Sequence, residues 1–163
     1  LRVLDGGWSA WRAVGGASDT LVPLVQPGDF IGAPQPERLI DARTLQSRLH
    51  DPDLALLDAR GAARYRGEVE PIDLVAGHIP GATCAPFTDN LSTDNRFKTP
   101  EALRQRFTAL IGNPAETVCY CGSGVTACHN IFAAVLAGLP EPRLYAGSWS
   151  EWIADPARPV ARG

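Results

Sequence analysis

The chain has 163 residues, of which 45% are hydrophobic and 20% are charged, and its formal net charge at pH 7 is −3. These values are typical of one ordinary globular domain and exclude the clustered basic surface of a nucleic-acid-binding protein. No apolar run approaches the roughly 20 residues of a membrane-spanning helix, and four cysteines do not indicate a disulfide scaffold. We therefore expect no membrane and no nucleic acid among the partners, and a reducing, cytoplasmic setting.

The beginning of the chain repeats a pattern that returns at its end. Residues 4–11 read Leu-Asp-Gly-Gly-Trp-Ser-Ala-Trp and residues 145–152 read Tyr-Ala-Gly-Ser-Trp-Ser-Glu-Trp, with both tryptophan pairs 141 positions apart (149 − 8 and 152 − 11). Because the second copy closes a domain, we expect residues 1–16 to be the tail of a preceding, similar domain. The alternative is a chance similarity between two Gly-Trp turns.

A linker is predicted at residues 17–37, where four prolines and two glycines interrupt any regular pattern. Prolines at this density prevent a regular helix and favour an extended chain. The remaining residues, 38–163, are then expected to form the domain that carries the chemistry.

From residue 38 onwards, short apolar runs alternate with segments of helical character. Strands are predicted at 54–57, 83–85, 117–121 and 143–145, and helices at 62–66, 99–110, 125–136, 150–153 and from 41 onwards. Asp41 is a candidate helix cap, and Pro100 suits the first position of its helix. Strands alternating with helices predict an α/β domain whose parallel sheet is covered on both faces.

The strongest chemical signal lies where the predicted strand at 117–121 meets the helix at 125–136. Cys121 ends the strand, and a glycine-rich loop leads from it into the helix. Unpaired N–H groups at a helix N-terminus stabilise a thiolate and lower its pKa from the ordinary value of about 8.5. We therefore predict Cys121 as a nucleophile, and the alternative is a buried structural cysteine. The residues predicted to surround its sulfur are Gly122, Ser123, Gly124, Val125 and Thr126.

The sequence Cys-Gly-Ser-Gly-Val-Thr-Ala at 121–127 resembles the active-site loop of the rhodanese-family sulfurtransferases, and most closely that of the 3-mercaptopyruvate type. The thiosulfate type usually has Arg-Lys where this chain has Gly122 and Ser123. The other matching pieces, in the order of the family, are Leu-Asp-Ala-Arg at 57–60, Ala-Arg-Tyr at 63–65, Gly-His-Ile-Pro-Gly-Ala at 77–82 and Gly-Ser-Trp-Ser-Glu-Trp at 147–152. Together they cover residues 38–163.

The resemblance implies a fold and a reaction. It implies a rhodanese-like three-layer domain, with a central parallel sheet of about five strands and helices on both faces, placed as the C-terminal catalytic domain of a tandem sulfurtransferase. Cys121 would take a sulfur atom from 3-mercaptopyruvate or thiosulfate, hold it as a persulfide, and pass it to a thiol, to thioredoxin or to cyanide. No metal or organic cofactor is implied.

Arg64 is the predicted contact for the anionic donor, because the matching arginine of the family has that role. From spacing alone, a surface arginine on a polar turn is the alternative. In the resembled mercaptopyruvate enzymes a second arginine often lies nine residues further on, where this chain has Asp73. This departure weakens the expectation of mercaptopyruvate as the donor.

Two other functions are alternatives to sulfur transfer. Tyrosine-phosphatase chemistry needs an arginine six positions after the cysteine, and this chain has Ala127 there. A non-catalytic binding or regulatory module on the same fold is the second hypothesis, although such modules commonly lack the cysteine that this chain retains.

The remaining histidines and cysteines are expected to be structural. Asp58 and Arg60 follow a strand and are assigned to structure, with Arg60 as an alternative second anion contact. His78 lies in a Gly-His-Ile-Pro-Gly turn that favours a structural hydrogen bond over a general base. Cys84 and Cys128 are predicted to be buried, and the spacing of cysteines and histidines indicates no zinc site.

Overall fold

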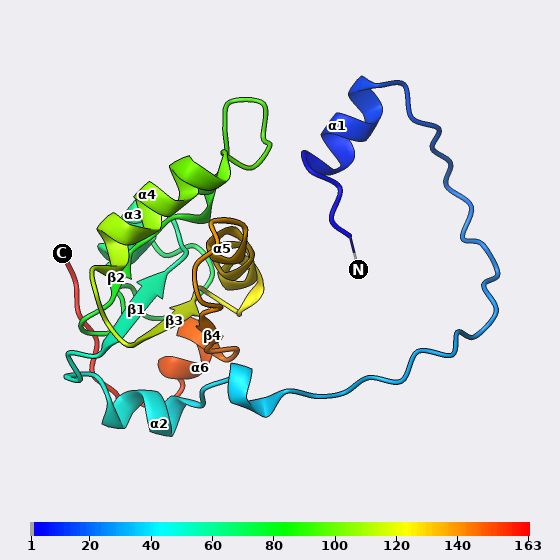
Figure 1. Ribbon diagram of the computed structural model, residues 1–163. Helices are drawn as coiled ribbons and strands as arrows, with labels where there is room; N and C mark the ends of the chain where they lie inside the picture. Colours follow the sequence, from blue (N-terminus) through cyan, green and yellow to red (C-terminus); the bar gives the residue numbers. More distant parts are fainter. Residues whose placement is uncertain (1) are drawn as a thin grey trace.

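The computed structural model describes residues 2–163, so residue 1 of the predicted N-terminal segment lies outside the described residues. In chain order the elements are α1 (Gly7–Ala13), η1 (Pro36–Arg38), α2 (Ala42–Ser47), β1 (Leu54–Asp58), α3 (Ala62–Tyr65), β2 (Thr83–Cys84), η2 (Phe87–Asn90), α4 (Pro100–Ile111), β3 (Glu116–Tyr120), α5 (Val125–Leu136), β4 (Arg143–Leu144) and α6 (Ser148–Trp152) (Figure 1). None of the helices described for residues 2–163 has the length and apolarity to cross a membrane.

The sheet is parallel throughout, with strands in the order β2-β1-β3-β4. Residues 2–163 supply four strands to it, where the resemblance implied about five. Leu39 occupies the fifth position as an isolated parallel bridge beside Leu144. In the segment between η1, which ends at Arg38, and the helix cap Asp41, Leu39 alone forms a bridge, so this segment is a bridge rather than a two-residue strand like β2 and β4.

Side chains of the central strands alternate between two hydrophobic clusters, one on each face of the sheet. Leu56 and Val118 face the cluster that contains the buried tryptophans of α6 and the buried leucine of α2. Leu57 and Cys119 face the cluster formed with α4 and α5, and Cys121 belongs to the same cluster. Both faces of the sheet are therefore covered by helices, as the strand-helix alternation predicted (Figure 1).

Helix starts follow the capping residues in the sequence. The Asp41 carboxylate accepts the N–H of Thr44 at 2.7 Å, and the Thr99 hydroxyl accepts the N–H of Ala102 at 3.3 Å, with Pro100 at the first position of α4. Each bond satisfies a backbone donor that the first turn of a helix leaves without an internal partner.

The N-terminal segment lies outside the two hydrophobic clusters. Residues 17–35 form no helix or strand and are almost entirely exposed, and Figure 1 shows them as a long loop beside the domain. Helix α1 buries none of its residues. A hydrogen bond from the Phe97 N–H to the Asp5 carboxylate, 3.0 Å long, connects this segment to the domain.

Candidate active site

The candidate site is built on the turn between β3 and α5. Strand β3 ends at Tyr120, Cys121 follows directly, and α5 begins at Val125. Gly124 has φ +82°, and a Cβ atom at this position would lie 2.7 Å from the Ala146 carbonyl oxygen. Only glycine combines this φ with so close an approach at low cost, so the turn brings the loop amides around the end of the strand.

Cys121 is only 2% exposed, and its thiol lies among hydrogen-bond donors of the loop. Burial raises the pKa of the thiol, but hydrogen bonds from the Thr126 hydroxyl and from the N–H groups of Ala127, Ser123 and Thr126 outweigh burial and lower the pKa below its ordinary value. Hydrogen bonds to a charged form stabilise that form. The turn therefore favours a thiolate at Cys121.

Cys119 shows what burial does without such donors. It faces the same hydrophobic cluster, two residues earlier in the chain. Burial is the main cause that raises the pKa of Cys119 to about 12. The contrast assigns the lowered pKa of Cys121 to the loop amides and the Thr126 hydroxyl rather than to the strand.

Cys121 opens onto a cavity of about 240 Å³. This volume suits a small molecule of a few heavy atoms rather than a large cofactor. The cavity is lined by Arg60, Gly61, Arg64, Ile72, Asp73, Phe87, Cys121, Gly122, Ser123, Val125, Thr126 and Ser150.

Arg64 lies over the loop, with Nη1 3.6 Å from the position that a Cβ atom of Gly122 would take. Its Nε and Nη2 donate to the Glu70 carboxylate at 3.1 and 2.6 Å, and Nη2 also donates to Asp73 at 3.1 Å. Within residues 2–163, Nη1 makes no hydrogen bond to a side chain or carbonyl, so this nitrogen is available to an anion beside the thiol.

Arg60 and Asp58 form a buried ion pair under the same cavity. The Arg60 guanidinium donates to the Asp58 carboxylate from Nε at 3.1 Å and from Nη2 at 2.6 Å, and Nη2 also donates to the Gly77 carbonyl at 2.6 Å. Its carbon Cζ lies 4.7 Å from the centre of the Trp149 ring. These contacts give Arg60 structural partners, and because Arg60 also lines the cavity, the alternative of a second anion contact stays a prediction.

The N-terminal end of α6 holds the other side of the loop. The Cys121 N–H donates to the Ser148 hydroxyl at 3.1 Å, and the Cys121 carbonyl accepts the Trp149 N–H at 3.0 Å. The Ser150 N–H donates to the Gly122 carbonyl at 3.0 Å. The Ser150 hydroxyl lies 2.7 Å from the Asp73 carboxylate, which links α6 to the Arg64 cluster.

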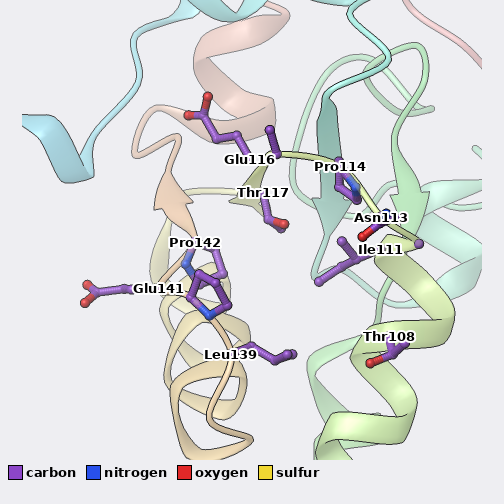
Figure 2. Close-up of a pocket in the computed structure, with 12 residues that line it drawn as sticks. Thr108, Ile111, Asn113, Pro114, Glu116, Thr117, Leu139, Glu141 and Pro142 are labelled. Carbon is purple, nitrogen blue, oxygen red and sulfur yellow. The ribbon is translucent and has the colours of Figure 1, made fainter.

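A larger cavity lies at the opposite end of β3, where the strand begins (Figure 2). Its volume is about 310 Å³, and among its lining residues the ionisable ones are Glu116 and Glu141. Figure 2 shows these side chains together with prolines and apolar residues from α4 and from the segment before β4. Its lining contains no cysteine, histidine or cation, in contrast to the cavity at Cys121, which combines a thiol of lowered pKa with two arginines.

Comparison with known families decides the classification. The family model described as the rhodanese-like domain matches residues 41–155, which include β1, β3, the Cys121 loop and α6. The chain belongs to the rhodanese-like domain family.

Sequence relatives of this rhodanese-like chain are named as sulfurtransferases. A probable 3-mercaptopyruvate sulfurtransferase from Pseudomonas aeruginosa is 65% identical over 100% of this chain and 58% of the relative. SseB of Mycobacterium tuberculosis, a putative thiosulfate sulfurtransferase, is 39% identical over the same shares. The 3-mercaptopyruvate sulfurtransferase of Homo sapiens is 35% identical over 98% of this chain and 54% of the relative. The chain thus spans little more than half the length of these relatives.

Solved structures with the same fold include a sulfur-handling enzyme. The anaerobic ergothioneine biosynthesis enzyme of Chlorobium limicola, in complex with trimethyl histidine, has a TM-score of 0.86 and 28% identity over 99% of this chain and 41% of that chain. A structure of EanB with a cysteine persulfide in a tetrahedral intermediate state with ergothioneine has a TM-score of 0.85 over the same shares.

The rhodanese-like fold brings most of the sequence-predicted site residues together. Arg64 lines the same cavity as Cys121, although the two residues are 57 positions apart in sequence (121 − 64). Gly122, Ser123, Val125 and Thr126 also line this cavity, whereas Gly124 contacts Ala146 behind the loop. Their roles in catalysis and binding stay predictions.

Sequence patterns assign no role to Glu70, Ser148 or Ser150, yet each contacts the loop or Arg64. Ser148 lies 27 positions from Cys121, and Ser150 lies 28 positions from Gly122, which is beyond the reach of local patterns. The signal that could have identified the serines is the Gly-Ser-Trp-Ser-Glu-Trp piece, which matches the family in sequence order.

Other residues of the domain lie away from the cavity. The Nδ1 atom of His78 is 2.8 Å from the Tyr65 carbonyl, and the His78 ring stacks on the Tyr65 ring, which confirms the predicted structural hydrogen bond.

Cys128 is exposed and Cys84 is half-buried, so the prediction that both are buried was wrong. Cys128 lies in α5 and lines two surface cavities. Residues 2–163 contain no group of three or more metal-ligating side chains.

Proposed function

We propose that this domain is a sulfurtransferase in which Cys121 carries sulfur as a persulfide between a small anionic donor and an acceptor. The observation that carries this proposal is the Cys121 thiol, held by loop donors that lower its pKa, in a small cavity that Arg64 also lines. The names of the sulfurtransferase relatives support the same reaction class.

The loading step is a nucleophilic displacement at sulfur. The Cys121 thiolate attacks the outer, sulfane sulfur of thiosulfate or the thiol sulfur of 3-mercaptopyruvate. A new S–S bond to Cys121 forms, and the donor's S–S or C–S bond to that sulfur breaks. With thiosulfate, the electron pair of the broken S–S bond leaves with sulfite. For 3-mercaptopyruvate the carbon leaves as the enolate of pyruvate, which then takes up one proton. The loop N–H groups that stabilise the thiolate are in position to stabilise the terminal sulfur of the persulfide.

The unloading step returns the enzyme to its thiolate form. An acceptor thiolate, from a small thiol or from thioredoxin, attacks the outer sulfur of the persulfide, and the bonding electrons return to Cys121. Cyanide in the same role leaves as thiocyanate. Neither step changes the number of electrons in the system, so the proposed reaction proceeds through the side chains of the domain without a metal or an organic cofactor.

The charges around the cavity favour a singly charged donor. Two arginines, Arg60 and Arg64, face three carboxylates, namely Asp58, Glu70 and Asp73. A thiolate at Cys121 adds one more negative charge. Because repulsion grows with the charge of the donor, we infer that 3-mercaptopyruvate, with one carboxylate, is preferred over the thiosulfate dianion. The Nη1 atom of Arg64 would bind the donor's carboxylate.

We also propose that residues 1–16 belong to a preceding rhodanese-like domain and that residues 17–37 connect it to the catalytic domain, residues 38–163. The repeat of the α6 sequence in α1 supports this arrangement, as does the share of each relative that the chain leaves unmatched. That preceding domain would be a partner of the site. Free cysteines throughout the described residues fit a reducing compartment such as the cytoplasm.

Intact-mass measurement tests the proposed reaction. The protein is incubated separately with 3-mercaptopyruvate and with thiosulfate, beside a Cys121→Ser variant treated in the same way. We expect a gain of one sulfur atom that is larger with 3-mercaptopyruvate, is absent in Cys121→Ser, and is lost on addition of a thiol. A gain that persists in Cys121→Ser would contradict the role of Cys121.

A failure to gain sulfur would favour the other hypothesis, a non-catalytic binding module. Because the relatives are longer than this chain, the same measurement is repeated with the chain extended by a preceding domain. No gain of sulfur in that longer protein would overturn the sulfurtransferase proposal.

A further inference from the structure

Ser148 is the first residue of α6 and has an unusual backbone conformation. Its φ is +55°, in the left-handed region that residues other than glycine rarely adopt, and its side chain is completely buried. Its hydroxyl accepts the Cys121 N–H at 3.1 Å and donates to the Tyr145 carbonyl at 2.9 Å. Both hydrogen-bonding functions of the hydroxyl are therefore used on backbone groups beside the nucleophile.

The internal repeat supplies a natural comparison for this position. Gly7 is the residue 141 positions before Ser148 (148 − 7), and it is the first residue of α1. Its φ is +57°, nearly the same as that of Ser148. The repeat therefore has a positive φ at the same position twice, with glycine in one copy and serine in the other.

The serine copy carries a conformational cost that the glycine copy avoids. A Cβ atom disfavours positive φ, whereas glycine adopts it freely. The backbone conformation alone therefore does not explain why a serine occupies position 148. The hydroxyl, with its bond to the Cys121 N–H, is what the serine adds and glycine lacks.

The hydrogen bond between the Cys121 N–H and the Ser148 hydroxyl matters because it helps to orient the Cys121 side chain. Cys121 is held at both ends of its backbone, through its N–H by the Ser148 hydroxyl and through its carbonyl by the Trp149 N–H. Fixing both groups sets the orientation of the Cα–Cβ bond, so the sulfur can reach the loop amides by rotation about this one bond. Without the hydroxyl, a buried N–H loses its partner, and the loop must move to satisfy it.

We propose that Ser148 is a positioning residue for the sulfur-transfer reaction, which acts through the Cys121 backbone to hold the sulfur against the loop amides. This inference rests on the proposed function of Cys121 and adds to it a residue from a different element. Ser148 itself does not line the cavity, so it acts without touching the donor.

Two variants separate the hydroxyl from the backbone conformation. Ser148→Gly removes the hydroxyl and relieves the positive φ, so the lost hydrogen bonds and the relieved strain act in opposite directions on its melting temperature. Ser148→Ala removes the hydroxyl and keeps the strain. Gly7→Ser is the matched control, because it places a serine at the same φ in the copy that is distant from Cys121.

The first readout needs no sulfur donor. The pH dependence of Cys121 alkylation by iodoacetamide is followed by tandem mass spectrometry of the peptides, in which fragment ions distinguish Cys121 from Cys119 and Cys128. We expect the midpoint to rise by about half to one pH unit in both Ser148 variants, because the sulfur shifts away from its donors. The midpoint in Gly7→Ser is expected to equal that of the wild type.

The second readout is the rate of persulfide formation with 3-mercaptopyruvate. We expect kcat to fall by about tenfold in Ser148→Gly with KM changed less than twofold, which is the pattern of a misplaced nucleophile rather than a lost binding contact. A folded Ser148→Gly with the alkylation midpoint of the wild type would overturn the inference. If the wild type forms no persulfide but the midpoint shifts, the proposed function fails while the positioning role stands.

Discussion

At the scale of single residues, the chemistry depends on which donors reach a buried sulfur. Cys119 and Cys121 lie two positions apart on the same face of the sheet, yet the pKa of Cys119 rises to about 12 and that of Cys121 falls. Burial acts on both thiols in the same direction. The difference therefore arises from the turn, where the Thr126 hydroxyl and three N–H groups point at one sulfur atom.

The Thr126 hydroxyl gives the first prediction. Thr126→Val keeps the size and branching of the side chain but removes the hydrogen bond that lowers the Cys121 pKa. The pKa should rise, so a smaller fraction of Cys121 is thiolate at pH 7, and sulfur loading should slow by about threefold to tenfold and recover at higher pH. A pH–rate profile of loading measures this shift.

The matched control is Thr108→Val in α4, which makes the same chemical change on the outside of the domain. It should leave the profile in place. If Thr126→Val slows loading equally at every pH, the hydroxyl contributes to geometry or binding, and its effect on the pKa is refuted.

Asp73 gives a prediction about donor preference. Its carboxylate lies 3.1 Å from Nη2 of Arg64 and accepts a hydrogen bond from the Ser150 hydroxyl. Asp73→Asn keeps an acceptor for Ser150 but removes one negative charge from the mouth of the cavity. We expect kcat/KM for thiosulfate to rise by about threefold to tenfold, and that for 3-mercaptopyruvate to rise less, because repulsion acts more strongly on a dianion.

Steady-state kinetics at low and high salt measure this change, since screening should reduce the gain. Asp94→Asn, an exposed change outside the cavity, is the control and should alter neither donor. A greater gain for 3-mercaptopyruvate than for thiosulfate would contradict the charge argument.

The sequence predicts those site residues whose role is local. The Cys121 turn is contiguous, so its glycines and hydroxyl residues could be recognised without a structure. The pairing of Arg64 with Glu70 and Asp73 could not be predicted in the same way, because it depends on how a loop of irregular backbone folds back over the site. The contact from Ser148 depends on the parallel alignment of β3 and β4, which joins segments 27 residues apart.

At the scale of elements, the junction of β3 and α5 sets the geometry of the site. Gly124 combines a positive φ with a close approach to the Ala146 carbonyl, and it is the N-cap of α5. The first N–H groups of α5 are free for the sulfur because the helix begins directly after this residue. A side chain at position 124 should therefore disturb both the fold and the thiol.

Gly124→Ala tests this junction. The substitution forces a Cβ atom into a positive φ and to within 2.7 Å of a carbonyl oxygen. We expect a loss of about 1–3 kcal/mol in the free energy of unfolding, measured by urea denaturation, and a higher Cys121 pKa. Gly28→Ala is the control, because a Cβ atom there meets nothing within 4 Å. Equal stability of the two variants would show that the turn tolerates a side chain.

Periodicity and capping signals predicted most elements of the domain. The helix at 125–136 has the bounds expected from its apolar run, and α4 begins at Pro100 as its cap predicts. The fifth strand was the exception. The resemblance predicts the number of strands that is usual in the family, but it does not predict that Leu39 alone pairs with Leu144 beside β4 in this chain.

At the scale of the whole molecule, the two copies of the repeat have opposite environments. Trp149 and Trp152 in α6 are completely buried, whereas Trp8 and Trp11 in α1 are 60% and 39% exposed. The same sequence pattern therefore closes a hydrophobic core in one place and lies on the outside in the other. We expect the folding free energy of this chain to reside in the domain that α6 closes.

The matched pair Trp11→Ala and Trp152→Ala tests this expectation, because the two residues are equivalent in the repeat. Trp152 packs in the core and donates its Nε1–H to the Pro159 carbonyl at 2.8 Å, so its loss should cost about 3–5 kcal/mol in the free energy of unfolding. Trp11 bonds locally to the Ala17 carbonyl at 2.9 Å, and its loss should cost less than about 1 kcal/mol. Urea denaturation followed by circular dichroism measures both. Comparable losses would mean that α1 is part of the folded core of this chain, and the assignment of residues 1–16 to a neighbouring domain would then be wrong.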